Sequence, residues 1–294
     1  VLVELRTRRL LRGARVIEIY GRLTGAAERL QAGEYLLEPG LTGRGLLSML
    51  AEGRVHQRRF VLLEGWRLAD VRAALARAPK LERRPEVQDD AALMAALGRP
   101  ELAPEGRFFP DSYDYAAGDS DLDLLARAFA RMETVLAEEW ADRLGGLPLA
   151  DPHEALVLAS LIEKETGVVA ERALIGGVFT RRLERGMRLQ TDPSVIYGLG
   201  ADFDGNLTRA DLRTPHPWNT YVHRGLPPTP IAMPGRAAIR AALRPAEGDA
   251  LYFVARGDGS SEFSATLEAH NAAVRRFQIE QRAEDYRSTP APQP

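Results

Sequence analysis

The stretch DPHEALVLASLIEKET, residues 151–166, decides how the rest of the chain is interpreted. Its opening Asp-Pro pair suits the cap and the first turn of a helix, so the sequence predicts a helix over residues 154–166. The helix is apolar nearly all round, which is typical of a helix buried in a protein core. Two carboxylates, Glu163 and Glu165, stand at its far end.

The two carboxylates cannot share one site. At about 100° per residue they point about 200° apart around the helix. Glu163 stacks over Ala159 and Ser160, one turn back, and these small side chains leave room for a ligand. Burial beside apolar surface would raise the pKa of Glu163, as a glycosidase general acid requires. On spacing alone, the simpler interpretation is favoured, in which Glu163 caps the helix end or pairs with an arginine.

Helices and short strands flank this stretch on both sides, and the pattern predicts an α+β fold. Strands are predicted at residues 60–63 and 251–255. The predicted helices lie at residues 68–78, 91–97, from 121 onward, 171–184 and 264–282. Beyond residue 187 the chain is rich in proline and turns.

The N-terminal part predicts a separate small module. Residues 16–20 and 33–37 are predicted strands, and a helix capped by Thr42 is predicted before Gly53. We therefore divide the chain into a small α+β module at residues 1–56, a larger mixed helical and β domain at 57–287, and a disordered tail at 288–294.

Composition excludes several classes of site. The chain of 294 residues has no cysteine, so it forms no disulfide and no thiolate zinc site. Its five histidines are scattered, and we expect no metal and no cofactor. A net charge of -2 gives no reason to propose nucleic acid as a partner. The chain begins without Met and has no long apolar run, so we expect a fragment that has lost an N-terminal leader or anchor.

A family resemblance adds chemistry to these patterns. The segment around Glu163 continues into GMRLQTDPSVIYG at residues 186–198, and together they resemble the signature of the endolytic murein transglycosylases, the YceG-like family. The family commonly has histidine where Ser261 stands, and Trp218 replaces its usual tyrosine. Further matching motifs lie at residues 64–66, 105–113, 171–172, 181–183, 219–221, 225–228, 230–231, 234–235, 252–254 and 263–271.

The resemblance implies an endolytic lytic transglycosylase that cleaves the MurNAc-GlcNAc β-1,4 bond of nascent glycan strands without water. The product carries a 1,6-anhydro-MurNAc end. Glu163 matches the catalytic glutamate: it would protonate the leaving oxygen and then take the proton from the C6 hydroxyl that attacks C1. One carboxylate can suffice because the nucleophile is part of the substrate, which gives it a high effective molarity.

Other motif residues are candidates for contacting the glycan or supporting the site. Asp192 could instead cap a helix, and Glu105 and Tyr113 could only fix a turn. His270 and Asn271 could pack or line a cleft, and Glu64 is interpreted as structural. The substrate-binding candidates are Gln190, Thr191, Asp192, Asn219, Tyr221, Glu105 and Tyr113, and the supporting candidates are Ser160, Glu165 and His270.

The resemblance also implies a setting. The N-terminal module resembles a LysM-like subdomain, which either binds glycan or only scaffolds. The partners implied are peptidoglycan glycan strands and, in a wider assembly, peptidoglycan synthases. The location implied is the periplasmic side of the inner membrane, held by a single N-terminal helix absent from this chain. Two other functions stay open: a hydrolase that uses Glu163 as acid and Asp192 as base or nucleophile, and a non-catalytic peptidoglycan-binding scaffold.

Overall fold

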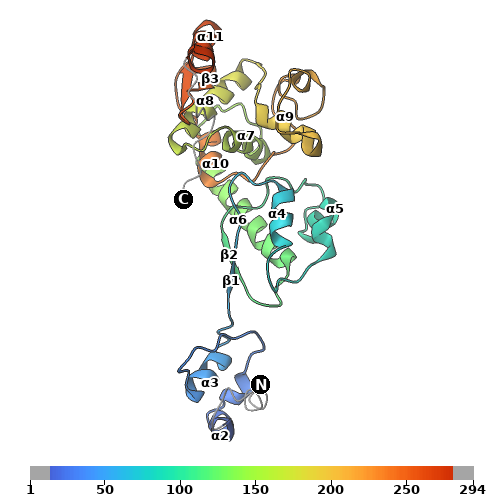
Figure 1. Ribbon diagram of the computed structural model, residues 1–294, viewed down its shortest axis with the longest axis vertical. Coiled ribbons are helices and arrows are strands. Elements are labelled where there is room, and N and C mark those ends of the chain that lie inside the picture. Colours follow the sequence, from blue (N-terminus) through green and yellow to red (C-terminus); the bar gives the residue numbers. More distant parts are fainter. Residues whose placement is uncertain (1–13, 281–294) are drawn as a thin grey trace.

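The computed structural model describes residues 14–280. The molecule is elongated, with α2 (Ala14–Leu23) and α3 (Gly43–Ala51) at one end and α11 (Leu267–Val274) at the other (Figure 1). Among the described residues, helices combine with two short antiparallel sheets. The α+β class is therefore confirmed.

The first predicted strand, residues 16–20, is wrong, because these residues belong to the helix α2. Their β-branched side chains favour a strand only weakly, and Val16, Ile19 and Tyr20 stay exposed in the helix. The helical form brings Gly21 against Leu47 of α3, where a Cβ at residue 21 would lie 3.4 Å from the leucine side chain. The short 3-10 helix η1 (Ala26–Arg29) completes this packing.

The second predicted strand, residues 33–37, does not form either. Its backbone contacts the rest of the unit through the His56 N–H, which donates to the Glu34 carbonyl at 2.7 Å, and a strand needs a ladder of such bonds. The predicted helix after it is confirmed as α3. The Thr42 side chain caps that helix by accepting a hydrogen bond from the N–H of Gly45 at 3.1 Å.

The middle of the molecule is built on the antiparallel pair β1 (Arg58–Val61) and β2 (Ser112–Tyr115). Strand β2 was not predicted, because its residues also suit a turn. Three short helical elements pack with the first half of the long helix α6 (Asp121–Ala141). They are α4 (Leu68–Leu75), η2 (Pro85–Gln88) and α5 (Asp90–Ala96).

A second core surrounds α7 (Pro152–Glu165), the helix that carries Glu163 and Glu165. As predicted, α7 is buried, and Asp151 caps it by accepting from the Glu154 N–H at 2.9 Å. It packs against α8 (Val169–Glu184), α10 (Arg236–Leu243) and the second half of α6. Gly176 allows the close approach of α8 and α10, because a Cβ there would lie 2.4 Å from the Ala241 carbonyl oxygen.

The C-terminal segment forms the hairpin β3 (Tyr252–Ala255) and β4 (Ser261–Ser264), followed by α11 and a π-helical stretch, η5 (Arg275–Glu280). The last helix begins at Leu267 rather than 264, because the Thr266 side chain caps it. The predicted tail at residues 288–294 lies outside the described residues. Along the chain, three elements lie between α8 and α10: α9 (Asp192–Leu199), η3 (Gly200–Asp202) and η4 (Asp211–Arg213).

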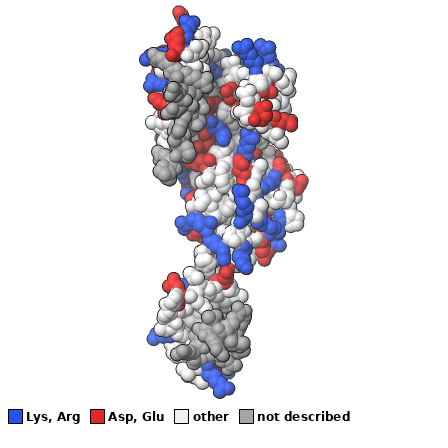
Figure 2. Space-filling view, in the orientation of Figure 1, with Lys and Arg blue, Asp and Glu red and all other residues white. Residues whose placement is uncertain are grey.

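Charges of both signs are interspersed over the face shown in Figure 2. Several form ion pairs that join elements, such as Arg236 on α10 with Glu138 and Glu139 on α6. The Glu139 side chain is almost wholly buried, and Arg240 also contacts it. These pairs link the helices around the second core.

Candidate active site

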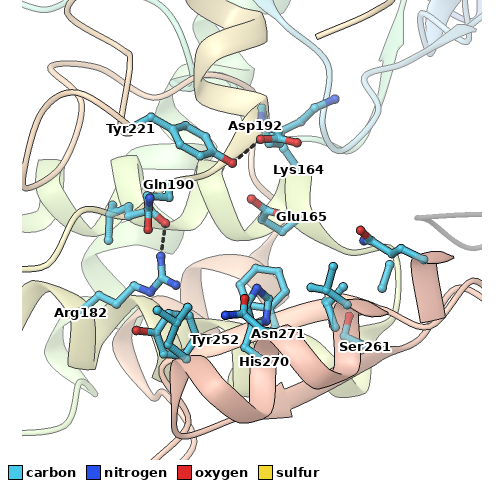
Figure 3. Close-up of a pocket in the computed structure, with 18 of the residues that line it drawn as sticks. Lys164, Glu165, Arg182, Gln190, Asp192, Tyr221, Tyr252, Ser261, His270 and Asn271 are labelled. Atoms are coloured by element: carbon cyan, nitrogen blue, oxygen red, sulfur yellow. Dashed lines mark hydrogen bonds between the residues drawn. The ribbon is translucent and has the colours of Figure 1, made fainter. Parts of the chain in front are cut away.

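A cavity of about 650 Å³ lies between the helical body and the C-terminal hairpin with α11. Figure 3 shows Glu165 between the Asp192–Tyr221 pair and the segment that carries Tyr252 and His270. The volume of the cavity falls in the range of ligand-binding pockets, roughly 300–1,000 Å³. The polar residues that line it are Lys164, Glu165, Arg182, Gln190, Asp192, Tyr221, Tyr252, Ser261, His270, Asn271 and Gln278.

Glu165 reaches the cavity because α7 ends there. Thr166 leaves the helical conformation, so the last turn of α7 is the point at which the buried helix meets open space. Burial raises the pKa of the Glu165 carboxyl to about 7, and the charge of Asp192 acts in the same direction. A carboxyl with this pKa is present in both protonation states near neutral pH, so it can donate and accept a proton.

Asp192 and Tyr221 form one hydrogen-bonded pair in the same wall. The Tyr221 hydroxyl donates to Oδ1 of Asp192 at 2.5 Å. Burial, followed by this hydrogen bond, raises the pKa of the Tyr221 phenol, so the hydroxyl keeps its proton. The pair therefore presents a carboxylate held in one orientation beside Glu165.

Backbone geometry holds Gln190 and Asp192 at the cavity. Gln190 has a φ of 52°, a left-handed conformation unusual for a residue with a side chain. Its N–H donates to the Thr220 carbonyl at 3.2 Å, and the next N–H, of Thr191, donates to the Thr220 hydroxyl at 3.0 Å. The turn that precedes α9 is thus fastened to the segment that carries Tyr221.

Arg182 joins the helical body to the other wall. Its Nε donates to the Leu251 carbonyl at 2.6 Å, and its Nη1 donates to the Leu189 carbonyl at 2.7 Å. The guanidinium carbon lies 5.0 Å from the centre of the Tyr252 ring, on which His270 stacks at 5.2 Å. Cation, phenol and imidazole therefore form one polar and aromatic surface facing Glu165 (Figure 3).

Glu163, the glutamate expected to be catalytic, does not line this cavity. Its side chain is 5% exposed, and its Oε1 lies 2.9 Å from Nη2 of Arg172. Its Oε2 accepts from the Gly235 N–H at 2.9 Å. The pairing with an arginine is thus present, and burial raises the pKa of the Glu163 carboxyl, as expected. A catalytic role for Glu163 stays a prediction. Arg172 also contacts Glu64 at 3.2 Å, so one cation joins two carboxylates.

The room expected beside Glu163 is filled by another part of the chain. Ala159 and Ser160 are fully buried, and the Ser160 hydroxyl accepts from the Ile231 N–H at 3.0 Å. The segment 230–235 therefore lies where a ligand was expected. Ser160 is a buried structural residue and does not support the site through the cavity. Sequence spacing gave no sign of this segment, because it lies about seventy residues away.

Four expected substrate contacts are placed in structural roles instead. Glu105 accepts from the Leu68 N–H at 3.0 Å and from the Tyr197 hydroxyl at 3.3 Å. The Tyr113 hydroxyl donates to the Phe109 carbonyl at 2.6 Å, so both residues fix turns, one of the two interpretations left open. Thr191 is buried behind the cavity wall.

Asn219 is the fourth expected substrate contact that has a structural role. It is fully buried, and its amide nitrogen donates to the carbonyls of Asp211 at 3.1 Å and Thr214 at 2.8 Å. Its Oδ1 accepts from the Tyr221 N–H at 2.9 Å. Asn219 therefore shapes the loop that delivers Tyr221 and makes no contact with the cavity. Of the expected set, Gln190, Asp192, Tyr221, Glu165 and His270 meet in one place.

Sequence reasoning did not select Arg182, Tyr252 or Lys164 as site residues. Arg182 and Tyr252 stand inside family motifs, but the motif alone does not tell which side chains face a ligand. Within residues 14–280, no group of three or more His, Asp or Glu residues is arranged to hold a metal ion. Within the same residues, every helix is too short or too polar to span a lipid bilayer.

Comparison with known proteins gives a consistent result. The sequence matches the YceG-like family over residues 1–276. An endolytic murein transglycosylase of Bacillus subtilis is 30% identical over 285 residues, covering 91% of this chain and 78% of that protein. A crystal structure of a yceG-like protein from Listeria monocytogenes has a TM-score of 0.61 at 28% identity, covering 92% of this chain and 93% of that one.

A pneumococcal relative is matched over a smaller share. The endolytic murein transglycosylase of Streptococcus pneumoniae D39 is 31% identical over 177 residues, which cover 58% of this chain. The match spans only 31% of that protein's own length.

Proposed function

This chain belongs to the YceG-like family, and on that premise we propose that it is an endolytic lytic transglycosylase of peptidoglycan. It cleaves the MurNAc-GlcNAc β-1,4 bond within nascent glycan strands without water and leaves 1,6-anhydro-MurNAc ends. The observation that supports this activity best is the position of Glu165, a carboxyl with a raised pKa in the wall of a cavity large enough for sugar rings.

Glu165 serves as both acid and base in this proposal. Protonated Glu165 first gives its proton to the glycosidic oxygen, and the C1–O bond breaks. The resulting carboxylate then takes the proton of the C6 hydroxyl as that oxygen bonds to C1. The enzyme returns to its starting protonation state, and no water is consumed. A single carboxyl can do both steps because they follow one another.

Asp192 supplies negative charge beside the reacting centre. The sugar at C1 becomes oxocarbenium-like as the bond breaks, and a carboxylate nearby stabilises that positive charge. The Tyr221 hydroxyl holds the Asp192 carboxylate in one orientation. Arg182, Tyr252 and His270 form the facing wall, where aromatic and polar groups suit sugar rings.

The decisive experiment compares two glutamates on one helix. Glu165→Gln is expected to abolish cleavage of purified glycan strands and to leave the melting temperature close to that of the unmodified protein. Glu163→Gln is its matched control, because it changes the other carboxyl of the same turn. If Glu163→Gln abolishes cleavage in a folded protein while Glu165→Gln stays active, the sequence-based assignment to Glu163 is right.

The ends of the products separate this activity from a hydrolase. Asp192 lies close enough to raise the pKa of Glu165, which also fits an enzyme that uses a second carboxylate as base or nucleophile. A hydrolase leaves a reducing MurNAc end, whereas the proposed reaction leaves an anhydro end, which is lighter by one water. Mass spectrometry of the digested strands therefore decides. A folded protein that binds strands and yields no product would be a scaffold.

The wider setting is proposed from the family resemblance. Residues 1–56 act as a LysM-like module without the two expected strands, and residues 57–287 carry catalysis. The protein works on the periplasmic side of the inner membrane, held by an N-terminal helix that precedes this sequence, and it meets peptidoglycan synthases there. A protein lacking residues 1–56 that still cleaves soluble strands at the full rate would assign that module to scaffolding.

A further inference from the structure

About half of the cavity wall comes from one continuous part of the chain. Residues 252–278, which we call the roof, comprise the hairpin β3–β4, α11 and the start of η5. The opposite wall, which we call the floor, comes from the end of α7, Arg182 on α8, the turn before α9, α9 itself and Tyr221. The roof residues that line the cavity are Tyr252, Phe253, Val254, Ala255, Ser261, Leu267, His270, Asn271, Val274 and Gln278.

The roof is attached to the body mainly through α8. Near the start of β3, Nε of Arg181 donates to the Ala250 carbonyl at 2.8 Å, and Nε of Arg182 donates to the Leu251 carbonyl at 2.6 Å. The Phe179 and Phe253 rings meet edge to face with centres 6.0 Å apart. These contacts fix one end of the hairpin, the end that enters β3.

The other strand of the hairpin is held by one buried carboxylate. Glu171, near the start of α8, accepts from the Ser261 N–H at 2.7 Å and from the Ser261 hydroxyl at 3.0 Å. Glu171 is 8% exposed. Its Oε2 also lies 3.5 Å from the hydroxyl of Thr166, the residue after Glu165. We call the two hydrogen bonds between Glu171 and Ser261 the clasp. The clasp connects the roof to the end of α7, the helix that carries the proposed acid.

We propose that Glu171 is a positioning residue that holds the roof over Glu165 and thereby sets the affinity for the glycan strand. The inference rests on the proposed function, because it takes the cavity to be the glycan site. Glu165, Asp192 and Tyr221 all belong to the floor. Loosening the roof therefore weakens binding and leaves the proton-transfer groups in place.

Hydrogen-bonding capacity, rather than charge, defines the clasp. In Glu171→Gln, the amide oxygen can still accept from the Ser261 N–H, and the amide nitrogen can donate to the Ser261 hydroxyl. Glu171→Ala removes both bonds and leaves the Ser261 groups without partners. Ser261→Ala removes only the hydroxyl bond and keeps the bond from the backbone N–H. The three variants thus form a graded series.

The test measures affinity, rate and roof motion separately. Initial rates on soluble, uncrosslinked glycan strands give KM and kcat, and hydrogen exchange reports on the amides of residues 252–264. For Glu171→Ala we expect KM to rise roughly tenfold, as for a lost pair of bonds to a charged group, and kcat to stay within about twofold. Exchange in the hairpin should accelerate. Ser261→Ala should be intermediate, and Glu171→Gln should resemble the unmodified protein.

Several results would overturn the proposal. One is unchanged KM and unchanged hairpin exchange in Glu171→Ala. Another is a loss in Glu171→Gln as large as in Glu171→Ala, which would assign the role to charge. A third is a fall in kcat at constant KM. If Glu171→Ala does not fold, Ser261→Ala decides on the same measurements. If the unmodified protein cleaves no glycan, the proposed function fails, and hydrogen exchange still tells whether Glu171 holds the roof.

Discussion

The Tyr221 hydroxyl lies 2.5 Å from Oδ1 of Asp192, and the two residues come from segments 29 positions apart. Tyr221→Phe removes this charge-assisted hydrogen bond and keeps the ring. Asp192 can then rotate away from the reacting centre, so we expect kcat/KM for glycan cleavage to fall roughly tenfold or more. Steady-state rates on soluble strands measure the change.

Tyr35→Phe is a matched control for that substitution. Tyr35 lies in the N-terminal unit, and its hydroxyl donates to the Gln31 carbonyl at 2.9 Å, far along the chain from the cavity. We expect it to leave kcat/KM unchanged. Equal activities for Tyr221→Phe and the unmodified protein would show that the orientation of Asp192 does not matter for cleavage.

The rate of cleavage should depend on pH through Glu165. The first step requires the protonated carboxyl, whose pKa is raised to about 7. We therefore expect kcat/KM to be lost as pH rises above about 7. Glu105→Gln is the control, because Glu105 has a pKa of about 7 as well but does not line the cavity. Disappearance of the alkaline fall in Glu105→Gln would assign that fall to Glu105 instead.

Stability should depend on pH with a definite sign. Burial raises the pKa of both Glu105 and Glu165 from their ordinary value of 4.5 to about 7. Between these values, the folded protein retains protons that the unfolded chain has lost. The free energy of unfolding therefore falls as pH rises through this window. The stability that the two protonated carboxyls contribute is fully present only below it. Each group contributes at most about 1.4 kcal/mol per pH unit.

Urea unfolding at pH 5, 6 and 7 measures this slope. Glu105→Gln removes one titrating group and keeps an oxygen that can accept from the Leu68 N–H. We expect its slope to be shallower than that of the unmodified protein. An identical slope would mean that Glu105 is ionised in the folded protein at pH 6.

Removing the cation between Glu163 and Glu64 should destabilise the fold. Arg172→Ala leaves the Glu163 carboxylate, 5% exposed, without its ion pair. We expect a loss of roughly 3–5 kcal/mol in the free energy of unfolding, as for one partner removed from a buried pair. The same substitution in a Glu163→Gln background should cost less, because no buried charge is left alone. Equal losses in the two backgrounds would rule out the ion pair as the cause.

The Glu64 side chain also restricts which residue can stand at position 235. A Cβ atom at residue 235 would lie 1.8 Å from Oε1 of Glu64, so Gly235→Ala must displace that side chain. We expect Gly235→Ala to lower the melting temperature in the unmodified protein and to be milder in a Glu64→Ala background. Differential scanning calorimetry of the four proteins measures this coupling. Additive effects would mean that the backbone at residue 235, rather than Glu64, resists the alanine.

Local patterns predicted the helices well, because capping and periodicity act over a few residues. The cap at Asp151, the buried face of α7 and the stop at Gly186 needed no tertiary information. The same reasoning failed for residues 16–20, which form a helix although Val16 and Ile19 stay exposed. Strands β2 and β4, four residues each, were missed because such short segments become strands only beside a partner.

The candidate site was predictable only in part. Helix geometry correctly separated Glu163 from Glu165, since two residues on a helix point in different directions. Which of the two meets a cavity depends on segments that arrive from elsewhere: residues 230–235 cover Glu163, and the roof leaves space over Glu165. Neither arrangement is encoded in the spacing of α7. The motif at residues 190–192 did locate the floor, although Thr191 is buried and does not itself line the cavity.

Helix α6 contributes side chains to both hydrophobic cores: Leu124 and Leu125 to one, and Met132 and Val135 to the other. A continuous helix of 21 residues transmits bending from one core to the other, because its backbone hydrogen bonds resist a hinge. The two cores should therefore melt in a single transition, and a load applied to the middle of the molecule should be felt at the cavity. Long polymer substrates exert such loads. Helix α6 therefore makes the two cores one rigid body, without a hinge between them.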